Sequence, residues 1–325
     1  MWSPTRSFRT APDSALWKGG DRAVRMAVFG DMGIVHAGHT FERLQTMVTK
    51  GSIDFMWQLG DIAYADDDFL QAPFSFGYED KWDLFMTRIE DVTGAEAAYM
   101  VLPGNHEAEC HSPACWMSVA KLQALSNFTA YNNRFRMPSA ESGGAANMWY
   151  SWNYGPIHFV SIDTETDFPN SFNDEWTWRG HTNGDFGDQL AWLEQQDLKR
   201  ADMERDVRPW IVVGGHRPMY CLEVVDRRGR PRAYAAVVQA AFEDLFETYG
   251  VDVYIAGHAH SYERQYPVYR SVHETSYLQP NHTVHFVSGA AGNIEDLGHY
   301  SASMFRPTWH GVSHTDEFGV SVVTV

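Results

Sequence analysis

The sequence has few cysteines and no long apolar segment. Its 325 residues include only three cysteines, Cys110, Cys115 and Cys221, which are too few for a disulfide scaffold. Cys110 and Cys115 are close enough in sequence to close a small loop, and buried free thiols are the alternative. No apolar run reaches membrane-spanning length, and residues 1–6 lack the apolar core of a signal peptide. We therefore expect a soluble chain without a membrane partner.

Basic residues are scarce relative to acidic ones. The chain has 25 Lys and Arg residues against 42 Asp and Glu residues, so its formal net charge is −17. Nucleic acids and anionic membranes are bound through Lys and Arg, which neutralise phosphate groups. The balance argues against both as partners. It fits simple solubility, together with a local cluster of carboxylates at a metal site. The sequence leaves the oligomeric state open.

Two N-glycosylation sequons are present, Asn127-Phe-Thr and Asn281-His-Thr. Sequons of this length also arise by chance, so they give only a compositional hint of a secretory route. We expect glycosylation at Asn127 and Asn281 and a secreted or secretory/vacuolar location, despite the missing signal core.

Short apolar runs alternate with polar loops over much of the chain. Five of these runs are each followed directly by a loop rich in Gly, Asp, Asn or His. The runs are Ala23–Phe29, Phe55–Leu59, Ala97–Leu102, Trp210–Val213 and Val251–Ala256. Continuous apolar runs of this length are typical of strands that are buried on both faces. Residues 148–162 look like an antiparallel hairpin around Gly155, and residues 238–249 have helical spacing. The pattern predicts an α/β fold with a mixed sheet or a pair of sheets.

The five polar loops carry the candidate chemistry. Taken singly, each is weak, because Gly-Asp and Gly-Asn-His segments also form ordinary turns. Taken together they are informative, since ligands of α/β folds gather beyond the carboxyl ends of the strands. The loops contain six potential metal ligands: Asp31, Asp61, Asn105, His216, His258 and His260. His258 and His260 lie two apart in an extended segment, so their side chains point the same way and can serve adjacent metal ions.

These six side chains suit the hydrolysis of a phosphate ester. That reaction needs charge neutralisation at the phosphoryl oxygens and a hydroxide near neutral pH. Two metal ions about 3.5–4 Å apart supply both. They require a bridging carboxylate, with imidazole and oxygen ligands around it. The set therefore predicts a phosphoesterase with two metal ions.

The order of the motifs resembles a known family. The segments GDMG (30–33), GDIAY (60–64), GNHE (104–107), VGGH (213–216) and GHAH (257–260) look like those of calcineurin-like metallophosphoesterases. Most of that superfamily has Asp-x-His as its first motif, whereas this chain has Gly33 and places Tyr64 three residues after Asp61. The loss of the first-motif histidine together with the gain of a tyrosine after the second aspartate resembles the purple acid phosphatase branch. The resemblance implies a sandwich of two mixed β-sheets flanked by helices, with the active site at the C-terminal ends of the strands.

The resemblance also implies a role for each candidate ligand. A ferric ion would be bound by Asp31, Tyr64 and His260, with Asp61 bridging to a second ion. That divalent ion, which is Zn, Mn or Fe(II) in the family, would be bound by Asn105, His216 and His258. A phenolate is a hard anionic donor suited to a highly charged ion, and imidazoles suit zinc or iron(II).

The implied activity is that of an acid phosphatase. Metal-activated hydroxide would attack small phosphate monoesters at acidic pH. His106 would hydrogen-bond the phosphate and protonate the leaving alkoxide, with a purely orienting role as the alternative.

One position departs from the family pattern. In many relatives a second histidine, about nine residues after the VxxH histidine, also contacts the substrate. Here that place is Val225-Asp226, followed by two arginines at 227–228. Either an arginine takes over the phosphate contact or another loop supplies it. Glu107 and Arg217, next to the motifs, are expected to be structural rather than catalytic.

Two divisions of the chain are expected from the resemblance. Residues 1–22 look like the remnant of a preceding fibronectin-like domain and its linker, because Ser7–Pro12 resembles the last strand of such a domain. Residues 23–325 are expected to form the catalytic domain. Glu317–Val325 resembles a late strand of that domain, and a truncation at its C-terminus is left open.

Two further functions remain as alternatives to an acid phosphatase. The same dinuclear chemistry serves a phosphodiesterase or a nucleotide pyrophosphatase, and Gly33 and Tyr64 favour the acid phosphatase over these. A catalytically idle binding protein that keeps the fold is the third possibility. None of the seven implied metal ligands is missing, which disfavours it.

Overall fold

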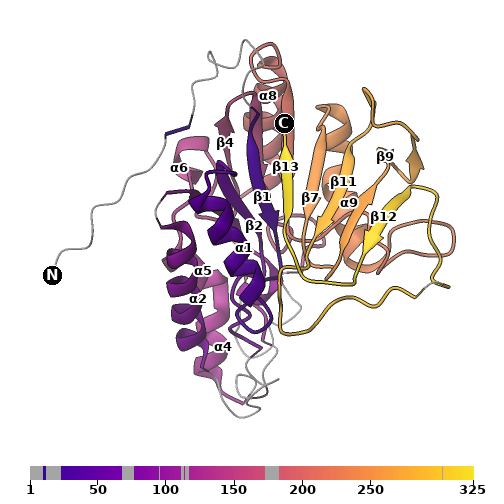
Figure 1. Ribbon diagram of the computed structural model, residues 1–325. Coiled ribbons are helices and arrows are strands. Elements are labelled where there is room, and N and C mark those ends of the chain that lie inside the picture. The colour runs from indigo at the N-terminus through magenta and orange to yellow at the C-terminus, as the bar shows by residue number, and fades with distance from the viewer. Residues whose placement is uncertain are drawn as a thin grey trace.

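Two mixed β-sheets packed face to face form the centre of the molecule (Figure 1). The computed structural model describes residues 10–11, 23–67, 77–94, 96–110, 113, 117–172, 183–301 and 303–325. Most of the segment 7–12 and all of Cys115 lie outside the described residues. Cys110 is disulfide-bonded, and Cys221 is a buried free thiol.

The first sheet has four strands in the order β13-β1-β2-β3. They are β13 (Ser321–Thr324), β1 (Arg25–Phe29), β2 (Phe55–Leu59) and β3 (Ala98–Leu102). Strands β1, β2 and β3 are parallel, and β13 runs antiparallel to β1 beside it. Leu59 pairs with Leu102, so the loops that leave β2 and β3 start at the same level. This register brings the second and third motifs of the chain together.

The second sheet has seven strands in the order β12-β8-β11-β7-β6-β5-β4. They are β12 (His310–His314), β8 (Tyr262–Gln265), β11 (Val284–Ser288), β7 (Val253–Ala256), β6 (Trp210–Gly214), β5 (Ile157–Ser161) and β4 (Tyr150–Tyr154). The four central strands from β11 to β5 are parallel, whereas β4 and β8 are antiparallel to them. A separate two-stranded ribbon consists of β9 (Val268–Tyr269) and β10 (Val272–His273). The expected hairpin is confirmed as β4 and β5.

Side chains from alternate positions of the inner strands fill the space between the sheets. Val28, Trp57 and Phe159 belong to this layer, and the rings of Trp57 and Phe159 meet edge to face with centroids 5.8 Å apart. Their neighbours along the strands, such as Ala27 and Met56, belong to a second cluster that includes the helices. The strands are thus buried on both faces, as their continuous apolar sequences predicted.

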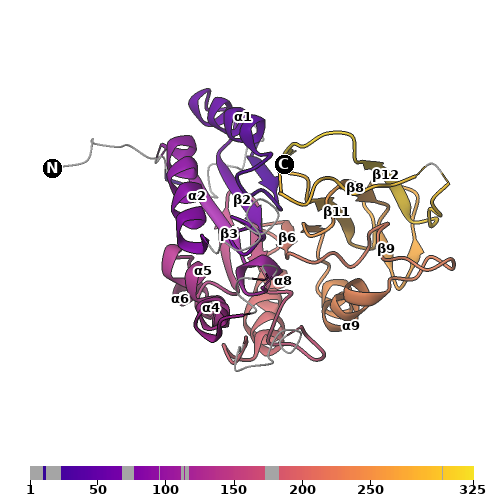
Figure 2. The ribbon, with the colours of Figure 1, turned by 90° about the horizontal axis from the view of Figure 1, so that it is seen from below.

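Helices cover the outer faces of both sheets. Figure 2 shows α1 (Gly38–Thr49) and α2 (Tyr78–Thr93) along the first sheet and α9 (Ala233–Thr248) beside the second. The predicted apolar face of α9 buries Val238 and Phe242. The shorter helical segments are η3 (Asn105–Glu107), α4 (Val119–Leu125), η4 (Ser126–Phe128), α5 (Thr129–Arg134), α6 (Ser139–Ser142), α7 (Gln189–Ala191), η5 (Trp192–Leu198) and α8 (Lys199–Met203).

The predicted α/β class is therefore confirmed, in the form of a pair of mixed sheets flanked by helices. Among the described residues, no helix is both long and apolar enough to cross a membrane.

Candidate metal centre

The five predicted loops meet where the carboxyl ends of the parallel strands of both sheets come together. Three of them follow β1, β2 and β3 of the first sheet, and two follow β6 and β7 of the second. Backbone hydrogen bonds link them directly: the Asp31 amide donates to the Gly60 carbonyl at 3.3 Å, and the Gly257 amide donates to the His216 carbonyl at 2.9 Å. The site is therefore built from main chain as much as from side chains.

Close packing explains why glycine precedes the ligands in these loops. Gly60 has φ +79°, and a Cβ atom at this position would lie 2.6 Å from His216 Nδ1 and 2.7 Å from the backbone of Gly104. No larger residue fits there without moving a candidate ligand. The Gly-Asp pair at 60–61 is thus more than an ordinary turn, because the glycine lets three loops touch.

One half of the site surrounds the Tyr64 phenol. Its oxygen lies 3.3 Å from Asp31 Oδ1, 3.4 Å from Asp61 Oδ2 and 3.1 Å from His260 Nε2. The His260 nitrogen in turn lies 3.5 Å from Asp31 Oδ1. These four side chains are those that the resemblance assigned to the ferric ion. Three oxygens and one imidazole nitrogen converge here, which is a donor set for a hard metal ion.

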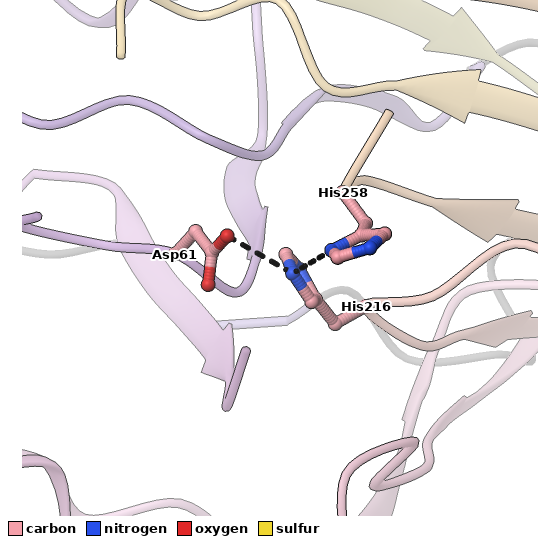
Figure 3. A group of neighbouring side chains, drawn as sticks. All are labelled: Asp61, His216 and His258. Atoms are coloured by element: carbon pink, nitrogen blue, oxygen red, sulfur yellow. Dashed lines mark hydrogen bonds and ion pairs between the residues drawn. The ribbon is translucent and has the colours of Figure 1, made fainter. Parts of the chain in front are cut away.

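The other half of the site is richer in nitrogen. Asn105 Oδ1 lies 3.0 Å from His216 Nε2 and 2.9 Å from His258 Nδ1, and the two histidine nitrogens are 3.2 Å apart. Asp61 Oδ2 lies 3.1 Å from His216 Nε2. Figure 3 shows Asp61, His216 and His258 pointing toward one another from three different loops. One amide oxygen and two imidazoles fit a divalent ion such as zinc or iron(II).

Asp61 connects the two halves. Its Oδ2 atom is the one that approaches both Tyr64 and His216, whereas its Oδ1 accepts the backbone amide of His106 at 2.9 Å. Asp31 is held in the same way, since its Oδ2 accepts the His258 amide at 2.8 Å and its Oδ1 faces Tyr64. Each carboxylate therefore has one oxygen fixed by the backbone and one directed into the site.

Hydrogen bonds on the side away from the site fix the orientations of the His216 ring and the Asn105 amide. His216 Nδ1 lies 2.7 Å from the Leu59 carbonyl, which leaves its Nε2 toward the centre. The Asn105 amide donates to Glu109 at 3.0 Å, so its oxygen is directed at the two histidines. Metal ligands in proteins are commonly oriented by such partners. Sequence reasoning missed Glu109, because a single glutamate four residues after a ligand carries no distinctive pattern.

Four of the seven candidate ligands have left-handed backbone conformations. The φ angles are 59° at Asp31, 47° at Asp61, 50° at Tyr64 and 66° at His258. This region is uncommon for residues other than glycine and costs energy, so it persists only where surrounding structure enforces it. Its concentration at these positions supports a functional role for the loops.

The electrostatics of the cluster favour a bound cation. Burial raises the pKa of the Asp31 carboxyl, and burial followed by Asp31 and Asp61 raises the pKa of the Tyr64 phenol well above its usual value. Burial also opposes ionisation of Asp61, but His216 and His106 outweigh it and hold its pKa well below the ordinary range. A metal ion between these oxygens would reverse the cost of ionising the phenol and the carboxyl. The residues present thus fit a pair of metal ions.

His106 lies beside the cluster and is paired with a buried carboxylate. Its Nδ1 is 2.9 Å from Asp66 Oδ1, and its Nε2 is 4.0 Å from Asp61 Oδ2. Burial opposes protonation of this ring, but Asp66 and Asp61 outweigh it and raise the pKa of His106 well above its usual value. Asp66 is fully buried, and sequence analysis did not single it out. Its proximity to GDIAY was the only available signal.

Glu107 and Arg217 make the structural contacts expected of them. Glu107 accepts backbone amides from Asp61 at 2.9 Å, Ile62 at 2.9 Å and Gly104 at 2.8 Å, which ties the second loop to the third. Arg217 pairs with Glu165 at 2.8 Å and with Glu109 at 3.2 Å. Arg217 also lines the cavity next to the metal centre.

The segment at the departing position is a turn held by Asp226. Its carboxylate accepts the backbone amides of Arg228 at 2.8 Å and Arg230 at 3.0 Å. Asp226 lines a different cavity from the metal centre, and among the described residues the arginine that lines the cavity of the centre is Arg217. This favours the second alternative, in which another loop supplies the phosphate contact, over an arginine at 227–228.

Comparisons with known proteins agree with this geometry. The model of the calcineurin-like phosphoesterase family matches residues 24–262. An acid phosphatase of Aspergillus ficuum is 31% identical over 92% of this chain and 63% of its own length. Human acid phosphatase type 7 is 33% identical over 98% of this chain and 64% of its own length. A purple acid phosphatase from yellow lupin (Lupinus luteus) seeds has the same fold, with a TM-score of 0.69 and 21% identity over 100% of this chain and 52% of its own. The chain thus spans less than two thirds of the length of these relatives.

Proposed function

Because the chain belongs to the calcineurin-like phosphoesterase family, we propose that it is an acid phosphatase of the purple type. It hydrolyses small phosphate monoesters at acidic pH, with a ferric ion and a divalent ion in the centre described above. Residues 23–325 form its catalytic domain, and the family match over residues 24–262 supports this division.

The observation that carries the proposal is the position of Tyr64. Its phenol oxygen lies within 3.4 Å of Asp31, Asp61 and His260, and the residue is buried. Ionisation of this phenol beside two carboxylates is unfavourable unless a strongly charged cation lies among the oxygens. In this arrangement Asp31, Tyr64 and His260 would hold the ferric ion, and Asn105, His216 and His258 would hold the divalent ion. Asp61 lies between the two sets and would serve both ions.

The chain's own groups then position and protonate the substrate. When bound, the two metal ions supply Lewis acidity for the phosphoryl oxygens and for the attacking water. His106 directs its Nε2 toward the centre while Asp66 fixes its Nδ1. A protonated His106 donates to the phosphoryl group and gives its proton to the leaving alkoxide. Before this transfer, the neighbouring carboxylates stabilise the protonated form of the His106 ring.

We also propose that the protein passes through a secretory route. Asn127 and Asn281 of the two sequons are both exposed, so a glycosyltransferase can reach them. A mobility shift after glycosidase treatment of the protein from its native host would support this, and unmodified asparagines in a peptide map would oppose it.

The activity is tested by comparing 4-nitrophenyl phosphate with bis(4-nitrophenyl) phosphate from pH 4 to pH 9. An acid phosphatase hydrolyses the monoester faster, with its optimum on the acidic side. Faster hydrolysis of the diester would favour a phosphodiesterase. A metal-loaded protein that hydrolyses neither would be a binding protein with the same fold.

A further inference from the structure

A cavity of about 850 Å³ opens beside the metal centre. Asp61, Asn105, His258 and His260 line it, so it reaches both halves of the centre. A phosphate ester held at the metal ions would therefore lie in this cavity, with its phosphoryl oxygens open to N–H donors of the wall. The histidine that contacts the substrate in many relatives is missing at Val225, so another residue of the wall is the candidate for that contact.

Arg217 is the only Lys or Arg among the described residues that line this cavity. It directly follows His216, a candidate ligand of the divalent ion. The backbone amides of both residues donate to Thr164 Oγ1, at 3.1 Å from His216 and 2.8 Å from Arg217. The Nη1 atom of Arg217 lies 3.5 Å from His258 Nε2. The guanidinium is therefore placed against the nitrogen-rich half of the centre.

Three contacts hold this guanidinium in one orientation. Its Nε donates to both carboxylate oxygens of Glu165, at 3.0 and 2.8 Å, and its Nη2 donates to Glu109 Oε1 at 3.2 Å. Its central carbon lies 4.1 Å from the centroid of the Phe172 ring, so the planar group packs on an aromatic face. Neither carboxylate contact uses Nη1, which is the nitrogen on the side of His258.

The two carboxylates offset the positive charge of Arg217. Its value to a substrate would therefore lie in a directed N–H donor, while the metal ions would neutralise the phosphate charge. A donor that is already fixed forms a charge-assisted hydrogen bond without losing side-chain freedom on binding. Arg217 thus has a structural role through Glu109 and Glu165, and its place on the cavity wall allows a second role.

We propose that Arg217 contacts the substrate in place of the missing histidine, by donating from Nη1 to a phosphoryl oxygen of the bound ester. The inference rests on the proposed function, because it assumes that the ester lies at the metal ions. The loop of His216 then supplies both a metal ligand and a phosphate contact, and the turn at 225–231 supplies neither. Glu109 and Glu165 are positioning residues, since they act on the substrate only through the guanidinium that they hold.

The test measures the binding of inorganic phosphate to the metal-loaded protein by titration calorimetry. Arg217→Lys keeps a positive charge beside Glu109 and Glu165 but lacks the Nη1 donor. The double variant of Arg217→Gln with Glu165→Gln removes the guanidinium without leaving Glu165 as an unpaired buried charge. In both we expect the Kd for phosphate to rise about 10–100-fold with metal content unchanged, as the loss of a hydrogen bond to a charged group predicts. Arg230→Lys is the matched control and should keep the wild-type Kd, since Arg230 is exposed, pairs with Asp226 and lines a different cavity.

A crystal structure of the metal-loaded wild type with inorganic phosphate tests the contact without any substitution, so a variant that fails to fold does not leave the question open. We expect Nη1 of Arg217 within about 3.2 Å of a phosphate oxygen. A phosphate bound at the metal ions beyond hydrogen-bonding distance of Arg217 would refute the proposal.

Phosphate binding also separates this inference from the proposed function. If the protein hydrolyses no monoester but the Arg217 variants bind phosphate more weakly, the activity is wrong and the contact stands. If the wild type is an active phosphatase and the folded, metal-loaded double variant binds phosphate as tightly as the wild type, the contact is refuted and the phosphatase stands. In turnover of 4-nitrophenyl phosphate the loss should appear mainly in KM, because the contact forms in the bound ester as well as in the transition state.

Discussion

Replacement of Glu263 by glutamine should change how stability depends on pH. Glu263 lies in β8 and is fully buried. It accepts hydrogen bonds from Tyr300 at 2.7 Å, from the Gln265 side chain at 2.8 Å and from the Leu222 amide at 3.1 Å. Because Tyr300 lines the cavity beside the metal centre, this carboxyl supports the wall of that cavity.

The sign and size of the effect follow from the pKa of Glu263. Burial raises this pKa from 4.5 to about 7, against the lowering effect of the hydrogen bonds. Between these values the folded state holds a proton that the unfolded state has lost. The stabilisation is therefore complete below pH 4.5 and is lost as the pH rises through about 7. A shift of this size corresponds to roughly 3 kcal/mol. Glutamine does not ionise, so the Glu263→Gln variant lacks this contribution.

Urea unfolding at pH 4.5 and pH 7.5 measures the difference. The wild type should lose about 3 kcal/mol more than Glu263→Gln between the two pH values. Any constant loss from the amide itself would appear at both pH values and cancel. Glu194→Gln, at an exposed position on η5, should behave like the wild type. Equal pH dependence in wild type and Glu263→Gln would show that folding does not raise the pKa of Glu263, and the burial argument would be wrong.

Two further predictions concern the centre itself. His106→Ala should lower kcat by about 10²–10⁴-fold while both metals stay bound, as measured by elemental analysis. Asp66→Asn should lower kcat by about 10–100-fold. Unchanged turnover in either variant would remove the pair from the mechanism. Asp61→Asn weakens the contacts to both halves of the site and should lose metal and activity together, whereas full metal content in the folded variant would contradict its bridging position.

The sequence was sufficient for the parts of the fold that depend on local pattern. The apolar runs 55–59 and 98–102 are strands, and they could be predicted because strands buried on both faces consist of continuous apolar residues. The convergence of five polar loops followed from the rule that such loops gather at the carboxyl ends of the strands. The local pattern left the number of sheets open, because the pairing partners of β1 and β6 are set by contacts between distant residues. The two mixed sheets were predicted by the family resemblance and are confirmed.

The supporting residues of the site were beyond sequence reasoning for a related reason. Asp66 orients His106, which lies 40 positions away, and Glu109 orients Asn105, which lies four positions away, and both stand just outside the recognised motifs. Arg217 was expected to be structural, and its ion pairs with Glu165 and Glu109 agree with this, but its place in the cavity depends on the tertiary fold. Sequence motifs identify the ligands, whereas tertiary packing determines which residues orient them.

We propose that Tyr64 completes a site for iron(III) next to a divalent ion. Elemental analysis of the purified protein, combined with its visible absorption spectrum, tests it most directly. We expect one iron and one divalent ion per chain, with a phenolate-to-iron(III) charge-transfer band that Tyr64→Phe abolishes without unfolding the protein. A colourless protein that binds two zinc ions and is active would contradict the claim.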